Sequence, residues 1–305
     1  MSPQDFILEG VSPIEEQERI ASKPVTYGQD VWRRFRRNRV ALIAAILLLL
    51  LLLLVLLGPM LSGYPIIERT NAKIRNQPPS AEHWFGTDTL GRDLFTRTCA
   101  GGRVSIVIGL AGAAIVLVIG TLYGGLAALL GGRADNLMMR IVDILSSIPN
   151  LLVIILISVV LDSKSVGTMI LAMTITGWCP TARIVRSEML RLSRTDYVLA
   201  ARLMDIPPIQ IVLRHMIPNA MSVILVDITF RIPGFIFSEA FLSYVGLGVQ
   251  PPQTSWGSLA AAAQGMFQFY PWQLLFPAGG IALTMLAFTL LGDGLRDALD
   301  PKLRR

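Results

Sequence analysis

The stretch VALIAAILLLLLLLLVLLGPML, which runs from Val40 to Leu61, decides the fold class of this chain because it holds no charged residue. A helix needs about 20 mostly apolar residues to cross a bilayer, where unsatisfied backbone groups are too costly. The basic run Arg33–Arg39 before it resembles the start of a signal peptide. However, the apolar run is too long for such a peptide, and no cleavage motif follows it. The stretch therefore predicts a retained transmembrane helix.

Five more apolar segments follow, so that six transmembrane helices are predicted in all. They are Val104–Leu130, Ile141–Leu161, Val166–Val185, His215–Val245 and Leu274–Leu291. The whole chain is 53% hydrophobic and only 16% charged, whereas a typical soluble domain is about 25% charged. This composition excludes intrinsic disorder and an ordinary soluble globule. We therefore expect an all-α, polytopic membrane protein.

The Lys and Arg residues predict how these spans are oriented. If the N-terminus is cytoplasmic, 19 of the 27 fall in cytoplasmic segments, seven fall outside, and Arg231 lies within a span. Basic residues prefer the cytoplasmic side, so both termini are predicted to be cytoplasmic. The net charge of +6 then reports membrane topology, and we expect no nucleic-acid partner.

These assignments divide the 305-residue chain into five parts. The first helix has leucine on every side, which is typical of a peripheral, lipid-facing position. We expect a cytoplasmic tail over 1–39, this peripheral helix over 40–61, an extracytoplasmic loop over 62–103, a five-helix core over 104–292 and a cytoplasmic tail over 293–305.

The chain lacks the residue patterns of the common catalytic sites. None of its four lysines follows a glycine, which excludes a P-loop for phosphates. The only histidines, His83 and His215, lie far apart, and Cys99 and Cys179 lack the spacing of metal ligands. We expect no catalytic residue, no metal site and no cofactor bound by this chain, so another subunit must supply energy for any driven process.

Three ionisable residues in the fifth span are candidates for a translocation path, because charges in membrane helices usually face a cavity or a partner. Asp227 and Arg231 are spaced i, i+4, so they can neutralise each other or contact a substrate. Glu239 has no obvious local partner and is the stronger path candidate. Asp143, three residues after Arg140, is expected to form an interfacial ion pair.

The cytoplasmic loop over 191–214 contains a short predicted helix that ends before Pro207. Ser193 or Thr195 can cap its start. Its apolar positions give it a face that can press on another surface; they are Val198, Ala201, Leu203 and Met204. It is either a docking helix or an ordinary surface helix that joins two spans.

Ala200, Ala201 and Ile217-Pro218 in this region resemble the signature of permease subunits of ATP-binding-cassette importers. That signature reads Glu-Ala-Ala, then Gly after three residues, then Ile-x-Leu-Pro after nine more. Leu199 replaces the acidic residue, and Asp205 stands where the family has glycine. Asp tolerates the left-handed conformation better than most residues, so we expect the turn to form there.

Longer matches make the chain similar to the oligopeptide, dipeptide and nickel branch of that family, and to its shorter "C" permease. The matching segments are Gly86–Asp93, Arg140–Asp143 with Ile148-Pro149, Phe241–Pro252 with Ser255–Gly257, and Gly292–Pro301. The resemblance implies a type I importer permease fold in a bacterial inner membrane. It also implies peptide cargo, with nickel, glutathione or oligosaccharides as alternatives.

The resemblance implies several partners: a homologous "B" permease, two cytoplasmic ATPases that hold ATP and Mg²⁺, and an extracytoplasmic binding protein. The loop helix would dock in an ATPase, through Tyr197, Ala200, Ala201, Arg202, Asp205 and Pro218. A secondary transporter driven by an ion gradient is the alternative of a different class, and it would also account for the charges in the fifth span. An intramembrane enzyme would need a catalytic constellation that the sequence lacks.

The segment Ala240–Gly292 contains no charged residue, which is rare for a free aqueous loop. Its glycines and prolines prevent one continuous helix, so we expect residues 242–268 to fold back into the outer mouth. By resemblance this segment would face the partner permease and the binding protein, with outer-mouth candidates Gly246, Gly248, Pro251, Pro252 and Trp256. Alternatively, its aromatic residues form an interfacial anchor: Trp256, Phe267, Phe269, Tyr270 and Trp272.

Overall fold

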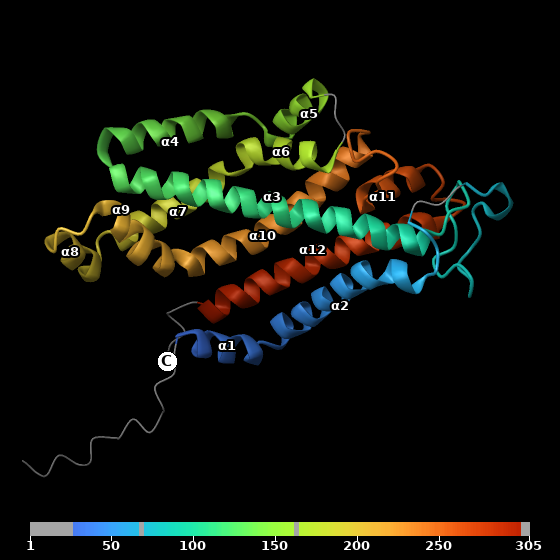
Figure 1. The fold of residues 1–305 in the computed structure, drawn as a ribbon, viewed down its shortest axis with the longest axis horizontal. Coiled ribbons are helices and arrows are strands. Elements are labelled where there is room, and N and C mark those ends of the chain that lie inside the picture. Colours follow the sequence, from blue (N-terminus) through green and yellow to red (C-terminus); the bar gives the residue numbers. More distant parts are fainter. Residues whose placement is uncertain (1–26, 67–69, 162–164, 300–305) are drawn as a thin grey trace, which may run out of the picture.

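The computed structural model describes residues 27–66, 70–161 and 165–299, which form one elongated helical bundle (Figure 1). Parts of both predicted tails, residues 1–26 and 300–305, lie outside the described residues. The helices are α1 (Tyr27–Arg37), α2 (Arg39–Leu61), α3 (Leu94–Leu130), α4 (Gly132–Ser147), α5 (Asn150–Val160), α6 (Val166–Gly177), α7 (Cys179–Leu192), α8 (Asp196–Leu203), α9 (Pro208–Ile211), α10 (Ile217–Tyr244), α11 (Trp256–Gln264) and α12 (Pro271–Leu299). A short 3-10 helix, η2 (Ala72–Ile74), lies in the loop after α2, and a π-helical turn, η3 (Val212–Met216), joins α9 to α10.

Four helical stretches are long and apolar enough to cross a membrane by themselves. They are α2, α3, the continuous stretch Pro208–Tyr244 that ends with α10, and α12. A fifth crossing results if the bent pair of α4 and α5 is one span. The prediction of an all-helical membrane protein is therefore confirmed.

Two of the predicted spans are broken, and proline explains both breaks. Ile141–Leu161 is not one straight helix, because α4 ends at Ser147 and α5 leaves it at an angle of 78°. Ile148 adopts an extended conformation before Pro149, as a residue that precedes proline prefers. Val166–Val185 is likewise divided into α6 and α7 at Trp178, two residues before Pro180.

α3 is the central helix, and it begins at Leu94 rather than at the expected Val104. The Asp93 carboxylate caps it by accepting the Thr96 N–H at 2.8 Å. Gly120 and Gly124 let α7 approach closely, because a Cβ on either glycine would collide with Thr181 or Ala182. The chain therefore packs α7, the helix that leads to the loop helix α8, directly on the central helix.

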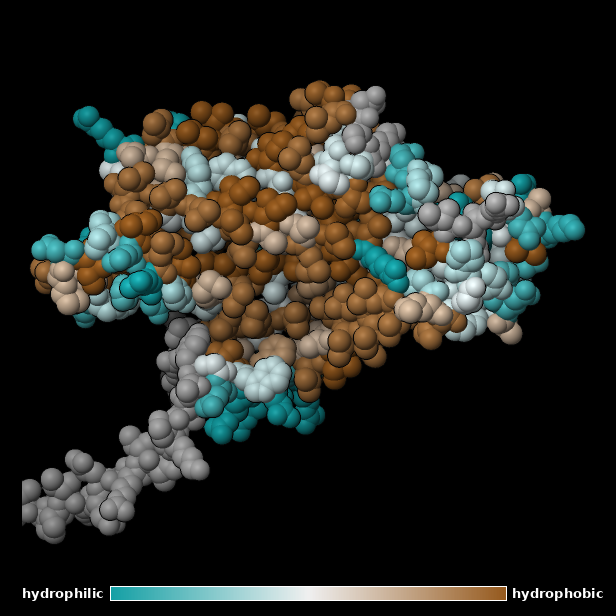
Figure 2. Space-filling view, viewed as in Figure 1, coloured by the Kyte–Doolittle hydropathy of each residue, from teal (hydrophilic) through white to brown (hydrophobic). Residues whose placement is uncertain are grey.

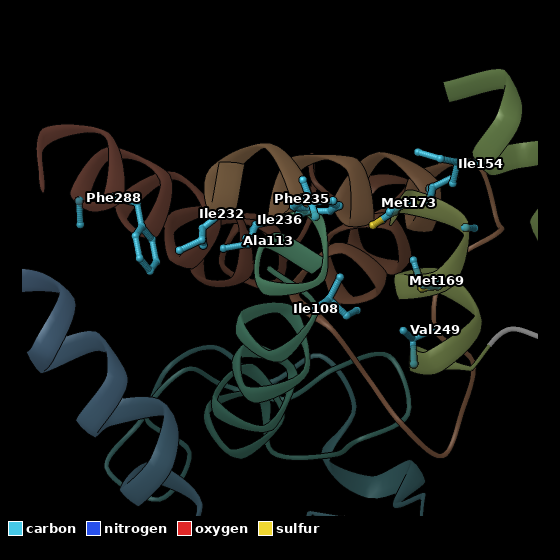
Figure 3. Packing of buried hydrophobic residues seen from close by; sticks show 14 of the residues in the cluster. Ile108, Ala113, Ile154, Met169, Met173, Ile232, Phe235, Ile236, Val249 and Phe288 are labelled. Atoms are coloured by element: carbon cyan, nitrogen blue, oxygen red, sulfur yellow. The ribbon is translucent and has the colours of Figure 1, made fainter. Parts of the chain in front are cut away.

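The main hydrophobic core lies where α3, α6, α10 and α12 meet (Figure 3). Its buried side chains include Ile108, Met173, Ile236 and Phe288, each at most 5% exposed. α2 lies at the edge of the bundle (Figure 1), with small residues such as Ala41 buried and most of its leucines exposed.

The surface divides into an apolar band between two hydrophilic ends (Figure 2). One hydrophilic end contains α8 and α9, and the other contains the loop that joins α2 to α3 (Figure 1). This is the surface that a membrane-spanning bundle needs, with lipid around the middle and water at both ends.

Candidate functional site

The loop helix α8 protrudes at one end of the bundle (Figure 1), and Thr195 stands at its N-cap position as predicted. Two of its four apolar positions, Val198 and Ala201, are buried against the protein's own core. The other two, Leu203 and Met204, point outward and are 87% and 67% exposed. The helix thus uses one face to hold itself on the bundle and presents the opposite face to solvent.

This orientation separates the loop residues that were predicted to dock. Tyr197, Ala200 and Arg202 lie on the exposed face. Ala201, which is 3% exposed, instead packs in the cluster that includes Val185, Met189 and Ile211. In this structure the Ala201 side chain faces inward, so Tyr197, Ala200 and Arg202 form the exposed face that a docked partner would meet.

Asp205 forms the left-handed turn that the sequence predicted, with φ of 55°. Its N–H donates to the Arg202 carbonyl, and the next residue, Ile206, donates to the Ala201 carbonyl at 3.3 Å. These two bonds together are the Schellman motif, in which a left-handed residue ends a helix. Asp205 thus replaces the family's glycine without loss of the turn, and it lines a pocket of about 450 Å³ beside α8 together with Arg202.

The connection from this loop into the membrane passes through the π-helical turn η3. Pro218, in the first turn of α10, has no N–H to donate to the Arg214 carbonyl four residues earlier. The widened turn over Val212–Met216 lies at this point. Such π turns are frequent at functional sites in helices, and here the turn lies between the loop and the predicted path helix.

A second connection is an ion pair between α7 and α4. Arg186 Nε donates to one Asp135 carboxylate oxygen and its Nη2 donates to the other, both at 2.5 Å. The Asp135 side chain is only 9% exposed. Because α7 leads directly into α8, this bidentate contact ties the start of the loop to the α3–α4 corner.

The predicted pair of Asp227 and Arg231 is present, with the closest contact at 3.2 Å. Thr181 on α7 adds a hydrogen bond, since its hydroxyl donates to the Asp227 carboxylate at 2.7 Å. Asp143 does not pair with Arg140 as expected; its partner is Arg183 on α7, at 2.9 Å. The break at Pro149 does not prevent this contact, because Asp143 lies on α4, before the break.

Glu239 lies inside the bundle, with no exposed surface. Its carboxylate accepts hydrogen bonds from Ser105 at 2.9 Å and Ser243 at 2.8 Å. Since Ser105 belongs to α3, the carboxylate links α10 to the central helix. The Glu239 carboxylate is therefore enclosed in this structure, and its place on a translocation path stays a prediction.

Two pockets lie along α10, and Phe230 lines both of them. The one nearer the α8 end is lined by Asp227 and by Arg296 of α12. The other, of about 200 Å³, is lined by Arg231 and by Asn150 of α5. The charged residues of this span thus face a grooved surface and not the core of the bundle.

At the opposite end the chain folds back after α10: α10 ends near Gly246, which has φ of 82°, and α11 returns against α10 and α12. Trp256 begins α11 and is 2% exposed. Its indole N–H donates to the Thr98 carbonyl at 2.8 Å, and its ring fills the space left by Gly102 and Gly280. Trp256 is therefore a core anchor and not an interfacial one.

The same end of the bundle also contains a charged pocket of about 250 Å³. Asp88 on the loop bonds to Arg92 at 2.8 Å and lies 3.5 Å from Arg97. Gly248 and Pro251 line the same pocket, and Pro252 follows in the same turn. The motif Gly86–Asp93 was visible in the sequence, but nothing local indicated that it meets a turn more than 150 residues later.

The sequence matches two family models. One is described as a binding-protein-dependent transport system inner membrane component and covers residues 120–305. The other is described as the N-terminal TM domain of oligopeptide transport permease C and covers residues 26–79. Together they cover the edge helix α2, the end of the central helix α3 and the helices that follow it.

Curated relatives align along nearly the whole chain. The oligopeptide transport system permease protein OppC of Bacillus subtilis is 46% identical over 303 residues, with 99% of each chain covered. The dipeptide transport system permease protein DppC of the same organism is 43% identical, with 99% of this chain and 94% of the relative covered. OppC of Escherichia coli is 40% identical, with 94% and 97% covered.

Among solved structures, an inward-facing conformation of the MetNI methionine ABC transporter is similar, with a TM-score of 0.54. The match covers 66% of this chain and 94% of that chain, at 20% sequence identity. This similarity concerns the fold alone.

Proposed function

Because this chain belongs to the family of binding-protein-dependent transport system inner membrane components, we propose that it encloses half of the pathway by which a peptide enters the cell. As such a component it is a multi-pass inner-membrane permease subunit, and it is not itself an enzyme. The observation that carries the proposal is the charged groove on α10, which contains Asp227 and Arg231 within a membrane span.

We propose six crossings with both termini cytoplasmic. α4 with α5 would form the third crossing, and α6 with α7 the fourth. This arrangement puts α8 and the end of α12 on one side and the loop between α2 and α3 on the other, in agreement with their places at the two hydrophilic ends (Figure 1). The excess of Lys and Arg in the segments at the α8 end supports the same orientation.

Each proposed partner is assigned to one surface: the two hydrophilic ends of the bundle and the groove along α10. A cytoplasmic ATPase, with ATP and Mg²⁺, would bind the exposed face of α8 through Tyr197, Ala200 and Arg202, with Leu203 beside them. A homologous permease would cover the groove on α10, because a charged groove cannot face lipid. An extracytoplasmic binding protein would deliver cargo at the outer pocket beside Asp88.

Coupling would proceed through the contacts around α8. Closure of the ATPase pair moves α8; the Arg186–Asp135 contact carries that motion to the α3–α4 corner, and η3 carries it to α10. The groove then changes from inward to outward facing, and hydrolysis resets it. The pump therefore alternates between two states and never forms an open pore.

Peptide cargo is supported by the relatives, whose names specify oligopeptide and dipeptide transport. Thermal-shift measurements on the cognate binding protein test this choice against nickel, glutathione and oligosaccharides. We expect di- to pentapeptides to raise its melting temperature. A shift with Ni²⁺, glutathione or an oligosaccharide and none with peptides would exclude peptide cargo.

An ion-gradient transporter is the competing class, because it would also place charged residues in a span. Uptake in the presence of a protonophore and without a sodium gradient separates the two. We expect uptake to continue under these conditions as long as ATP is supplied. Uptake that stops when the gradients collapse, while ATP is still present, would favour the secondary transporter.

A further inference from the structure

The pocket beside Arg231 has a composition that the transport role alone does not explain. It is about 200 Å³ in volume and lies between α5, α6 and α10. Polar groups come from Asn150, Arg231 and Ser238, and the remaining walls are apolar, including Phe235 and Met173. A few convergent polar groups in an otherwise apolar concavity are the mark of a small-ligand site.

The guanidinium of Arg231 is held by Asp227 on one side and lines the pocket with its remaining N–H groups. Its Nε and one terminal nitrogen donate to Asp227 at 3.3 and 3.2 Å, and Thr181 holds that carboxylate from the other side. A guanidinium carries five N–H donors, so two bonds to Asp227 leave donors for the pocket. The Arg231 side chain keeps 23% of its surface exposed, against 11% for Asp227.

Asn150 presents the same chemistry from the opposite wall. The Thr176 hydroxyl donates to the side-chain oxygen of Asn150 at 2.6 Å, which assigns that oxygen to the protein side. The amide NH₂ of Asn150 then remains as a donor group. The two walls of the pocket therefore both supply hydrogen-bond donors, and one of them carries a positive charge.

We propose that this pocket binds the C-terminal carboxylate of the transported peptide, with Arg231 and Asn150 as its ligands; this rests on the proposed peptide function. A carboxylate is planar and singly charged, which matches the fork of one guanidinium. The single Asp227 behind that guanidinium orients it without filling the pocket. Phe230 and Phe235 form apolar walls against which the last side chain of the peptide can pack.

The test compares a tripeptide with its C-terminal amide, both at concentrations that saturate the binding protein, in vesicles that contain the complete importer. Arg231→Gln is expected to slow uptake of the free acid about tenfold, the loss typical of a hydrogen bond to a charged group. Uptake of the amide should fall much less, because loss of the Asp227 pair affects both peptides alike whereas loss of the carboxylate contact affects only the free acid. The same binding protein is used with every variant. Its preference between the two peptides therefore cancels when the ratio of the two rates is compared between variants.

Two further variants keep the test decisive. Asn150→Asp leaves the Arg231–Asp227 pair intact and places a second carboxylate in the pocket, so it should slow the free acid and spare the amide even if Arg231→Gln assembles poorly. The matched control is Arg183→Gln, which breaks the 2.9 Å pair with Asp143 outside the pocket. This control should leave the ratio of the two rates unchanged.

The outcomes are distinguishable. An equal loss for both peptides, or no loss for either, in Arg231→Gln and Asn150→Asp would overturn the carboxylate site while the permease function stands. Uptake of neither peptide by the unaltered importer, with another cargo transported, would overturn the peptide function itself. A selective loss for the free acid in either pocket variant supports the site.

Discussion

The hydroxyl of Ser105 on α3 donates to the carboxylate of Glu239 on α10 at a distance of 2.9 Å, and both side chains are completely buried. The same hydroxyl oxygen accepts the backbone N–H of Trp256, the first residue of α11, at 3.1 Å. One serine therefore joins the central helix α3, the groove helix α10 and the helix α11 that folds back on both.

This junction predicts a structural role for Glu239. Ser105→Ala leaves a buried carboxylate oxygen and a buried N–H without their partner, which costs about 1–3 kcal/mol. We expect a lower thermal unfolding midpoint for the assembled complex in detergent. Ser147→Ala is the matched control, because its hydroxyl donates only to the Ile144 carbonyl of its own helix at an exposed position. An unchanged midpoint for Ser105→Ala would contradict this account of the junction.

A substitution that removes the contact between Arg186 and Asp135 is expected to lower the stability of the complex and to weaken its coupling to ATP hydrolysis. Arg186→Gln leaves the largely buried Asp135 carboxylate unpaired, and breaking a buried pair costs about 3–5 kcal/mol, less here because the Arg186 side chain is 28% exposed. Chemical denaturation of the complex measures this loss. The exchange of the two residues, Asp135→Arg with Arg186→Asp, should recover part of it. If the double variant is as unstable as Arg186→Gln, the ion pair does not contribute to the stability of the complex.

The turn at Asp205 predicts a sharp difference between two substitutions. Asp205→Gly keeps the left-handed conformation and should leave peptide-stimulated ATP hydrolysis close to the unaltered rate. Asp205→Val strains a β-branched residue at positive φ by about 1–2 kcal/mol and should shift or unwind the end of α8. Equal hydrolysis rates in the two variants would show that the turn does not position the loop helix.

The loop helix itself was predictable from the sequence, and the direction in which its residues point was not. Pro207 and Thr195 are local signals that bound α8 closely, although the Thr195 hydroxyl donates to the Leu192 carbonyl and does not cap the helix. Whether Ala200 or Ala201 faces a partner depends on how α8 lies on α7 and α9, which no local pattern specifies. The family-like signature contains both alanines, so the resemblance could not separate them either.

The membrane spans show the same limit. Uninterrupted apolar runs such as Val40–Leu61 were identified almost to the residue, because hydrocarbon demands length and apolarity alone. The prolines at 149 and 180 were visible, but the 78° bend at the first depends on neighbours that pack against both halves. Ion-pair partners were predicted only when they lie one turn apart, as in Asp227 and Arg231.

Partners distant in the sequence were missed for a related reason. Asp143 was assigned to Arg140 on the same helix, but its partner is 40 residues away on α7. Of the two serines that donate to Glu239, Ser243 is one turn away, but Ser105 is 134 residues away. A lone serine or asparagine in an apolar run carries no signal of its contact, so neither Ser105 nor Asn150 could be identified as a functional residue from the sequence.

The exposed face of α8 predicts opposite defects for two neighbouring substitutions. Ala200→Trp places a large side chain where the ATPase would pack, and closely packed surfaces do not tolerate that volume. The permease should fold normally and lose only its stimulation of ATP hydrolysis. Ala201→Trp instead overpacks the protein's own core, which typically costs about 1–3 kcal/mol, and should lower the unfolding midpoint of the permease pair.

The most direct test of the central claim is peptide uptake by vesicles that contain this chain, its partner permease, the two ATPases and the binding protein. We predict accumulation of a labelled tripeptide against its gradient that requires ATP hydrolysis by the partner subunits and is abolished by Ala200→Trp, with the complex still assembled. Equal accumulation without ATP, or by the assembled Ala200→Trp complex, would contradict the assignment of this chain as the α8-coupled permease of an ATP-driven importer.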